Sequence, residues 1–139
     1  MEKQTRVAVT GFLVVKNKVL IVRRSSKEGF FAGFYELPGG KLNFGENPGD
    51  ALRREFLEEV NLNVKVTRPY RVFSYMSGDG NKCTVDISHI LELADDVSNI
   101  KLSDAHDDLK WVTIEEIDKI KMSDEMKTNI VEGFKNLKK

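Results

Sequence analysis

The chain has 139 residues, and its 22 Lys and Arg residues balance 22 Asp and Glu residues, so its formal net charge is zero. The length predicts one domain over residues 1–139, and the neutral charge argues against binding of a nucleic-acid polymer by bulk charge. A single cysteine, Cys83, excludes an internal disulfide, and the lack of a signal-peptide layout or a membrane-length apolar run predicts a cytoplasmic protein with no membrane partner.

The first third of the chain predicts a β-hairpin followed by a loop. Residues 6–15 are apolar and rich in β-branched side chains, as a buried strand would be. Residues 16–18 have the character of a hairpin turn, and residues 19–23 would form the returning strand. Residues 25–46 are rich in Gly and aromatic side chains, and we interpret them as a loop.

A helix is predicted over residues 48–60. Asn47 is a favourable N-cap, Pro48 suits the first helical position, and Asp50 suits the positive end of the helix dipole. Asn61 follows as a residue that tolerates the left-handed conformation of a helix C-cap. The local sequence therefore specifies both ends of this helix.

Strands dominate the next part of the chain. Residues 63–76 have strand character that is interrupted near Pro69, and residues 77–81 form a turn cluster. Residues 83–92 alternate between apolar and polar side chains, which predicts a further strand. The acid-rich residues 94–108 are interpreted as a loop.

The C-terminal part predicts a short strand over residues 109–114 and two helices. Thr113 and Glu116 fit a capping box that opens a short helix, and Ser123 is a suitable cap for the last one. The last helix would carry an apolar face formed by Met126, Ile130, Val131, Phe134 and Leu137. Strands combined with two substantial helices predict a sheet flanked by helices.

The helix over residues 48–60 has two distinct arcs. At roughly 100° per residue, one arc is apolar and the next carries Glu55, Glu58 and Glu59, at i, i+3 and i+4. Like charges at this spacing destabilise a helix slightly, and three carboxylates on one face also suit a hard divalent cation. A solvated acidic face, with Arg54 paired to Glu58, is the alternative interpretation. The apolar arc consists of Leu52, Phe56, Leu57 and Val60.

The residues around this helix resemble the Nudix box, here at residues 40–62. The family pattern is Gly, five spacers, Glu, seven spacers, Arg-Glu, an aliphatic residue, a spacer, Glu-Glu, a spacer, Gly and an aliphatic residue. Gly40, Glu46 and the run of residues 54–62 follow it, with Phe56 and Asn61 as two departures that touch no expected metal ligand. Family members also share similar segments before and after the box, here residues 35–41, 109–112 and 114–116.

This resemblance to the Nudix hydrolases implies an α/β (α+β) fold, an α/β/α sandwich with a mixed β-sheet. It implies metal-dependent hydrolysis of a diphosphate linkage in a small nucleotide-like substrate. We favour a nucleoside triphosphate pyrophosphohydrolase that clears damaged nucleotides. Nucleotide sugars, ADP-ribose and dinucleoside polyphosphates stay open as substrates, as does a catalytically silent Nudix domain that senses a nucleotide. The oligomeric state is also open, with a homodimer as one alternative.

The resemblance also implies roles for individual residues. Glu58 and Glu59 would be the chief metal ligands, and Glu55 would be a further ligand or the base that acts on water. The Gly39 carbonyl would be another ligand, because a Gly-rich turn brings the backbone close to the site. Mg²⁺ is the expected ion, with Mn²⁺ as a substitute, and it would neutralise diphosphate charge, orient the substrate and activate water.

Two residues would support these ligands. Arg54 would hold a glutamate in place through a charge-assisted bond, and Glu46 would orient the groups that bind the metal. Many family members carry a further Glu six positions before Trp111, where this chain has Ala105. A fourth carboxylate is therefore either absent or supplied by one of the neighbouring acids, Asp104, Asp107 and Asp108.

Weaker signals concern the substrate and the core. Arg23 or Arg24, at a strand end, would contact phosphate or simply be solvated. Tyr35 would stack on a base, as would three nearby aromatic residues, although core packing is the plainer interpretation for most of them. Those three are Phe30, Phe31 and Phe34. We expect core positions for His89, as a hydrogen-bonded histidine, for Trp111, and for Cys83 as a strand residue with no nucleophilic role.

Overall fold

A computed structural model describes residues 2–26 and 31–137. Four strands precede the first long helix, and three strands, two short 3₁₀ helices and a second long helix follow it. In chain order the elements are β1 (Gln4–Val15), β2 (Lys18–Arg24), β3 (Tyr35–Glu36), β4 (Gly39–Lys41), α1 (Pro48–Val60), β5 (Val64–Met76), β6 (Lys82–Leu93), η2 (Val97–Asn99), β7 (His106–Val112), η3 (Ile114–Lys119) and α2 (Asp124–Asn136).

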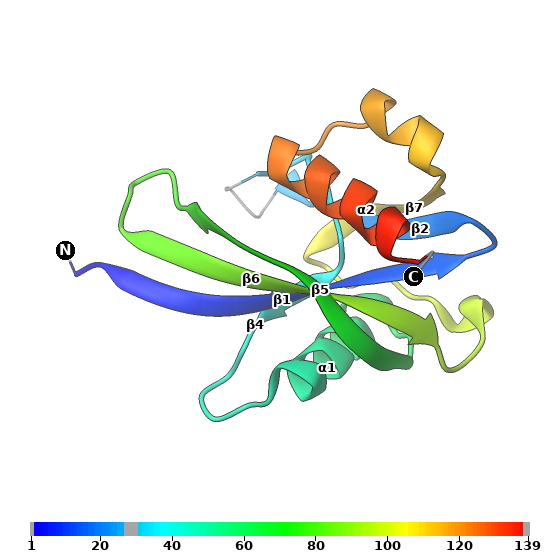
Figure 1. The fold of residues 1–139 in the computed structure, drawn as a ribbon, viewed down its shortest axis with the longest axis horizontal. Coiled ribbons are helices and arrows are strands. Elements are labelled where there is room, and N and C mark those ends of the chain that lie inside the picture. Colours follow the sequence, from blue (N-terminus) through cyan, green and yellow to red (C-terminus); the bar gives the residue numbers. More distant parts are fainter. Residues whose placement is uncertain (1, 27–30, 138–139) are drawn as a thin grey trace.

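The strands form one seven-stranded mixed sheet. Its main path runs β3-β2-β1-β6-β5, with β4 paired to β1 and β7 paired to β2. The long β1 and β6 pair in parallel, whereas the other pairs are antiparallel. Helix α1 covers one face, and α2 covers the other, with the short helix before it (Figure 1). The predicted mixed sheet between helices is confirmed.

Each face of the sheet has its own hydrophobic core. Phe56 and Leu52 of α1 are fully buried against one face, in a cluster that includes Leu13 of β1. On the other face, Phe12 of β1 meets Phe134 of α2 edge to face, with ring centroids 5.0 Å apart. Successive residues of β1 thus anchor the two long helices, because side chains alternate across a strand.

Helix α1 begins and ends where the sequence predicts. The Asn47 side chain accepts a hydrogen bond from the Gly49 N–H, and Asn61 adopts a left-handed φ of 58°. One member of the predicted apolar arc is wrong, because Leu57 is 44% exposed whereas Ala51 is fully buried. The buried arc is therefore rotated about the helix axis, away from Leu57 and toward Ala51.

Three other boundaries differ from the predictions. The region over residues 25–46, interpreted as a loop, contains the two short strands β3 and β4, which are too short to show any periodicity. The β7 strand begins at His106, inside the predicted acidic loop. Strand β5 continues through Pro69, and the predicted interruption is instead a pair of register shifts.

Strand β6 buries polar side chains. Thr84, Asp86 and Ser88 are 2%, 3% and 0% exposed, although they occupy the polar positions of its alternating pattern. His89 is buried, and its Nδ1 lies 3.1 Å from the Ile87 carbonyl oxygen, as predicted for a core histidine. Cys83 is only partly buried, which is a correction to its predicted core position.

In the part of the chain that the structure describes, no helix has the length and apolar character needed to cross a membrane.

Candidate active site

Two of the three glutamates of α1 lie against the glycine pair of β4, and the third is exposed. The Gly39 N–H donates to Glu59 Oε1 at 2.9 Å, and a Cβ placed on Gly40 would lie only 2.4 Å from the Glu55 carboxyl carbon. The Glu55 side chain is 14% exposed, whereas that of Glu58 is 58% exposed and reaches solvent. Glu59 therefore bonds to the backbone of β4, Glu55 lies against Gly40, and Glu58 is exposed to solvent.

Arg54 joins these carboxylates to the loop before the helix. Its Nε and Nη2 donate to the two oxygens of Glu46, each at 2.9 Å, in a two-pronged contact. Its Nη1 donates to Glu55 Oε1 at 2.9 Å and lies 3.2 Å from Glu58 Oε2. The Arg54 bond lowers the pKa of the Glu46 carboxyl to about 2, so that Glu46 stays ionised and holds the guanidinium.

Glu59 is the most electrostatically unusual of the three. Burial raises the pKa of its carboxyl to about 9, and nearby Glu36 and Glu55 add to the rise against the Gly39 hydrogen bond. Burial likewise raises the pKa of Glu55. Arg54 bonds to Glu55 and to the exposed Glu58, but no cation bonds to the buried Glu59 among the described residues. A divalent cation would supply positive charge there, so the donor set fits a hard metal ion.

The carboxylates are not already drawn into a coordination shell. Among the described residues, no group of three or more His, Cys, Asp or Glu side chains stands at metal-binding distance. Arg54 accounts for this at Glu55 and Glu58, because its guanidinium bonds to both. We expect Glu58 to turn from Arg54 toward a cation, while Glu46 keeps the arginine in contact with Glu55.

The Glu59 pKa predicts how the metal-free protein responds to pH. A folded-state pKa of about 9, above the ordinary 4.5, means that folding keeps a proton which the unfolded chain releases. Stability from this group is therefore present below about pH 4.5 and is lost as pH rises toward about 9. We expect the Tm in a chelator to fall between about pH 6 and about pH 9, and the fall to be smaller in Glu59→Gln. Parallel Tm curves for the two proteins would contradict the buried proton.

The predicted sources of a fourth carboxylate lie elsewhere. Asp107 accepts a hydrogen bond from Arg23 Nε at 2.6 Å, and Asp108 accepts one from the Tyr35 hydroxyl. Asp104 is exposed in the turn before β7. Among the described residues, none of the three belongs to a group of side chains with the α1 glutamates that could hold a metal ion. Their role as metal ligands therefore gains no support from this geometry.

Glu36 is the acid that sequence reasoning missed. Its carboxylate lies 3.5 Å from Arg24 Nη1 and 3.2 Å from His106 Nε2, and it is close enough to Glu59 to raise the pKa of that group. Tyr35 and Leu37 on either side of it are buried. That local alternation is the one signal in the sequence that would have placed Glu36 on the opposite side of a short strand.

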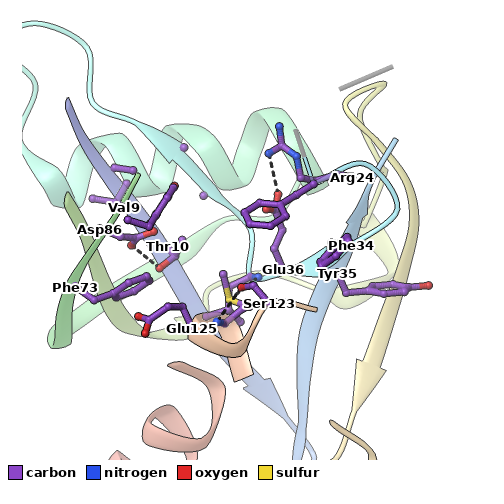
Figure 2. Close-up of a pocket in the computed structure, with 17 residues that line it drawn as sticks. Val9, Thr10, Arg24, Phe34, Tyr35, Glu36, Phe73, Asp86, Ser123 and Glu125 are labelled. Carbon is purple, nitrogen blue, oxygen red and sulfur yellow. Dashed lines mark hydrogen bonds and ion pairs between the residues drawn. The ribbon is translucent and has the colours of Figure 1, made fainter. Parts of the chain in front are cut away.

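A pocket opens beside the glycine pair (Figure 2). We call it the aromatic pocket, because five aromatic residues contribute to its wall, namely Phe31, Phe34, Tyr35, Phe73 and Tyr75. Gly39 and Gly40 also line it, so it adjoins the face of α1 that carries the glutamates. Its polar lining residues are Thr10, Arg24, Glu36, Asp86, Ser123 and Glu125. A ligand in the pocket would thus reach the carboxylates along the β4 backbone.

The predicted substrate contacts divide between the pocket and its surroundings. Arg23 bonds to Asp107, and the neighbouring Arg24 is the arginine that lines the pocket. Tyr35 lines the pocket too, but its ring points away from the other lining residues (Figure 2), and its hydroxyl donates to Asp108. Substrate binding by Arg23 and Tyr35 therefore stays a prediction.

The neighbouring aromatic residues divide in the same way. Phe31 and Phe34 contact each other in the pocket wall, with ring centroids 5.2 Å apart. Phe30 lies outside the described residues. Trp111 is partly buried and packs against the α1-side core, as expected.

Comparison with known proteins places the chain in a family. The model of the NUDIX domain matches residues 4–133. The chain belongs to the NUDIX family. This is the family of hydrolases that the box at residues 40–62 resembles, and its members generally use divalent metal ions and small nucleotide substrates. The Nudix fold is also found in solved structures: the MutT protein from Methanosarcina mazei Go1 superimposes with a TM-score of 0.83, at 25% identity, covering 100% of this chain and 99% of that one.

The names of curated Nudix relatives give several different activities. An ADP-ribose pyrophosphatase of Methanocaldococcus jannaschii is 34% identical over 63% of this chain and 50% of its own length. An 8-oxo-dGTP diphosphatase of Buchnera aphidicola is 36% identical over 48% of this chain and 51% of its own length. A nucleoside triphosphatase, NudI, of an Enterobacter species is 28% identical over 76% of this chain and 79% of its own length. The first two matches span only about half of each relative.

Proposed function

We propose that the chain is a Mg²⁺-dependent hydrolase that cleaves a diphosphate linkage in a nucleoside triphosphate and releases pyrophosphate. The observation that carries this proposal is the junction at Gly39 and Gly40, where the aromatic pocket adjoins the glutamate face of α1. A substrate with a flat base at one end and a polyphosphate at the other fits this arrangement. The names of the Buchnera and Enterobacter relatives support the same class, and clearing of damaged nucleotides is the role that we propose.

The α1 residues would divide the work as follows. Glu58 and Glu59 would hold Mg²⁺, or Mn²⁺ in its place, and the ion would supply charge neutralisation at the diphosphate and activation of water. Glu55 would bind the ion as well or accept the proton of the attacking water. The water oxygen forms a bond to phosphorus, the bridging P–O bond breaks, and pyrophosphate leaves. Arg54, anchored by Glu46, would keep the glutamate side chains from drifting apart.

A substrate panel tests this function. The purified chain should release pyrophosphate from nucleoside triphosphates with Mg²⁺, lose activity in excess EDTA and regain it when Mg²⁺ is added back. ADP-ribose, a nucleotide sugar and a dinucleoside polyphosphate complete the panel. Faster cleavage of one of these would replace the triphosphate as substrate while keeping the chemistry. Full turnover in EDTA would refute the metal mechanism.

The alternative is a nucleotide sensor that binds its ligand without turnover, and the same substrate panel distinguishes it from an enzyme. Such a protein would bind nucleotides, measured by calorimetry, yet release no pyrophosphate or phosphate with any metal. Glu55 and Glu59 favour the enzyme, because a sensor has no need to keep buried acids that oppose one another.

A further inference from the structure

The polar face of β6 brings a buried carboxyl group into the aromatic pocket. Asp86 is 3% exposed and lines the pocket beside Thr10, whose hydroxyl donates to Asp86 Oδ1 at 2.9 Å (Figure 2). The Thr10 hydroxyl is also 2.8 Å from that of Ser88. The second carboxyl oxygen, Oδ2, accepts no hydrogen bond from the described residues, and it is not among the atoms that are buried without a partner, so it stays accessible from the pocket. A donor that enters the pocket can therefore reach it.

Asp86 differs in this respect from the other acids of the pocket. Glu36 contacts Arg24 and His106, and Glu125 accepts a hydrogen bond from Arg71 at 3.0 Å. Asp86 forms no ion pair among the described residues, although Arg71 is close enough to lower the pKa of its carboxyl. Burial raises the pKa of Asp86 to about 6, so the group is still mostly ionised near pH 7.5 and acts only as an acceptor.

The surroundings of Asp86 define the chemistry of its partner. Phe73 lies directly opposite Asp86 in the β5–β6 register, and its ring and that of Tyr75 give the pocket surfaces on which a flat heterocycle can stack. Phosphate is disfavoured beside Asp86, because this buried carboxylate has no ion pair among the described residues and would repel it. The fitting group is therefore a planar base with N–H donors on its edge.

We propose that Asp86 selects the base of the substrate by accepting hydrogen bonds from the two adjacent N–H groups of a guanine-type edge. This assignment rests on the proposed function, in which the base occupies the aromatic pocket. A guanine edge offers a ring N–H beside an amino group and so matches the two oxygens of a carboxylate. An adenine edge offers a ring nitrogen beside its amino group, and that lone pair faces an acceptor.

Two changes test the assignment together: a substitution that removes an acceptor from the protein, and a ligand analogue that lacks a donor. Asp86→Asn keeps the shape and the Thr10 contact but replaces one acceptor oxygen by an amide. Inosine triphosphate differs from guanosine triphosphate only by lacking the amino group. For the unmodified protein, kcat/KM should be roughly 10- to 100-fold higher with guanosine than with adenosine triphosphate, and should fall with inosine triphosphate.

In Asp86→Asn the preference for guanosine over inosine triphosphate should largely disappear. The substitution and the missing amino group remove the two partners of the same hydrogen bond. Tripolyphosphate, which has no base, should be cleaved equally by both proteins. Glu92→Gln, an acid-to-amide change at an exposed position of the same strand, is the matched control and should retain the preference. A thermal melt of each variant checks that the fold is intact.

The outcomes separate this inference from the proposed function. If no triphosphate is cleaved, the proposed function fails, and calorimetric binding of guanosine and inosine monophosphates to the unmodified protein and to Asp86→Asn still tests Asp86. If triphosphates are cleaved but Asp86→Asn keeps the guanosine preference, Asp86 does not select the base. A preference for adenosine triphosphate in the unmodified protein would also overturn the assignment.

Discussion

Replacing Glu58 or Glu59 by Gln is expected to lower kcat by roughly 100- to 1,000-fold while leaving the fold intact. Each change removes a charged metal ligand and preserves the shape of the side chain. The loss falls on kcat because the metal acts on charge that develops in the transition state. The fold should hold because Glu58 is mostly exposed, and because Glu59 is a carboxyl group whose ionised form is already opposed by burial.

Glu46→Gln should cost less, roughly 10- to 100-fold, because Glu46 acts through Arg54 and contacts no expected metal ion. The expected order is thus a larger loss for Glu58→Gln and Glu59→Gln than for Glu46→Gln. Glu132→Gln on α2 is an acid-to-amide control outside the site. Equal, unchanged kcat values for all the variants would mean that the α1 glutamates take no part in the reaction.

Helix α1 was predictable because its determinants are local. The Asn47 cap, Pro48 and the left-handed Asn61 all act within a few residues of the chain, and the spacing of the three glutamates fixes their common face. The one error, the exposed Leu57, arises where the sheet decides which edge of the apolar arc it covers. Local chemistry specifies the helix, and tertiary packing specifies its rotation.

Glu36 and Asp86 were not predictable in the same way. Glu36 lies on a two-residue strand that pairs with β2, so the short alternation of Tyr35, Glu36 and Leu37 is the only local signal that marks it. Asp86 occupies a polar position of an alternating strand, which ordinarily faces solvent. It is buried because β1 and β5 flank β6 and place Thr10 and Phe73 beside it. Both residues depend on strand register between distant segments, which a single sequence does not specify.

Changing each of the two β4 glycines to Ala should have different effects: the change at Gly39 should lower stability, and the change at Gly40 should lower activity. At Gly39 a Cβ would lie 2.0 Å from the Val9 carbonyl oxygen and 2.8 Å from the Thr10 Cα, both in the backbone of β1. Neither atom can move without displacing the strand on which both cores rest. We expect Gly39→Ala to destabilise the fold by about 3 kcal/mol or more, measured by denaturant unfolding.

At Gly40 the same change should instead reduce catalysis. The added Cβ would lie 2.4–2.6 Å from the carboxyl atoms of Glu55, which form the end of a flexible side chain that can swing aside. The fold should therefore survive, while Glu55 leaves the position from which it binds metal or receives the proton of water. Because displacement of a reacting group by about 1 Å can cost about 100-fold in rate, we expect a kcat loss of that order. Gly78→Ala, where a Cβ meets nothing within 4 Å, is the control that should change neither quantity. A Gly40→Ala protein with full activity would show that Glu55 does not need its place beside β4, and the role of that carboxylate in the reaction would fall with it.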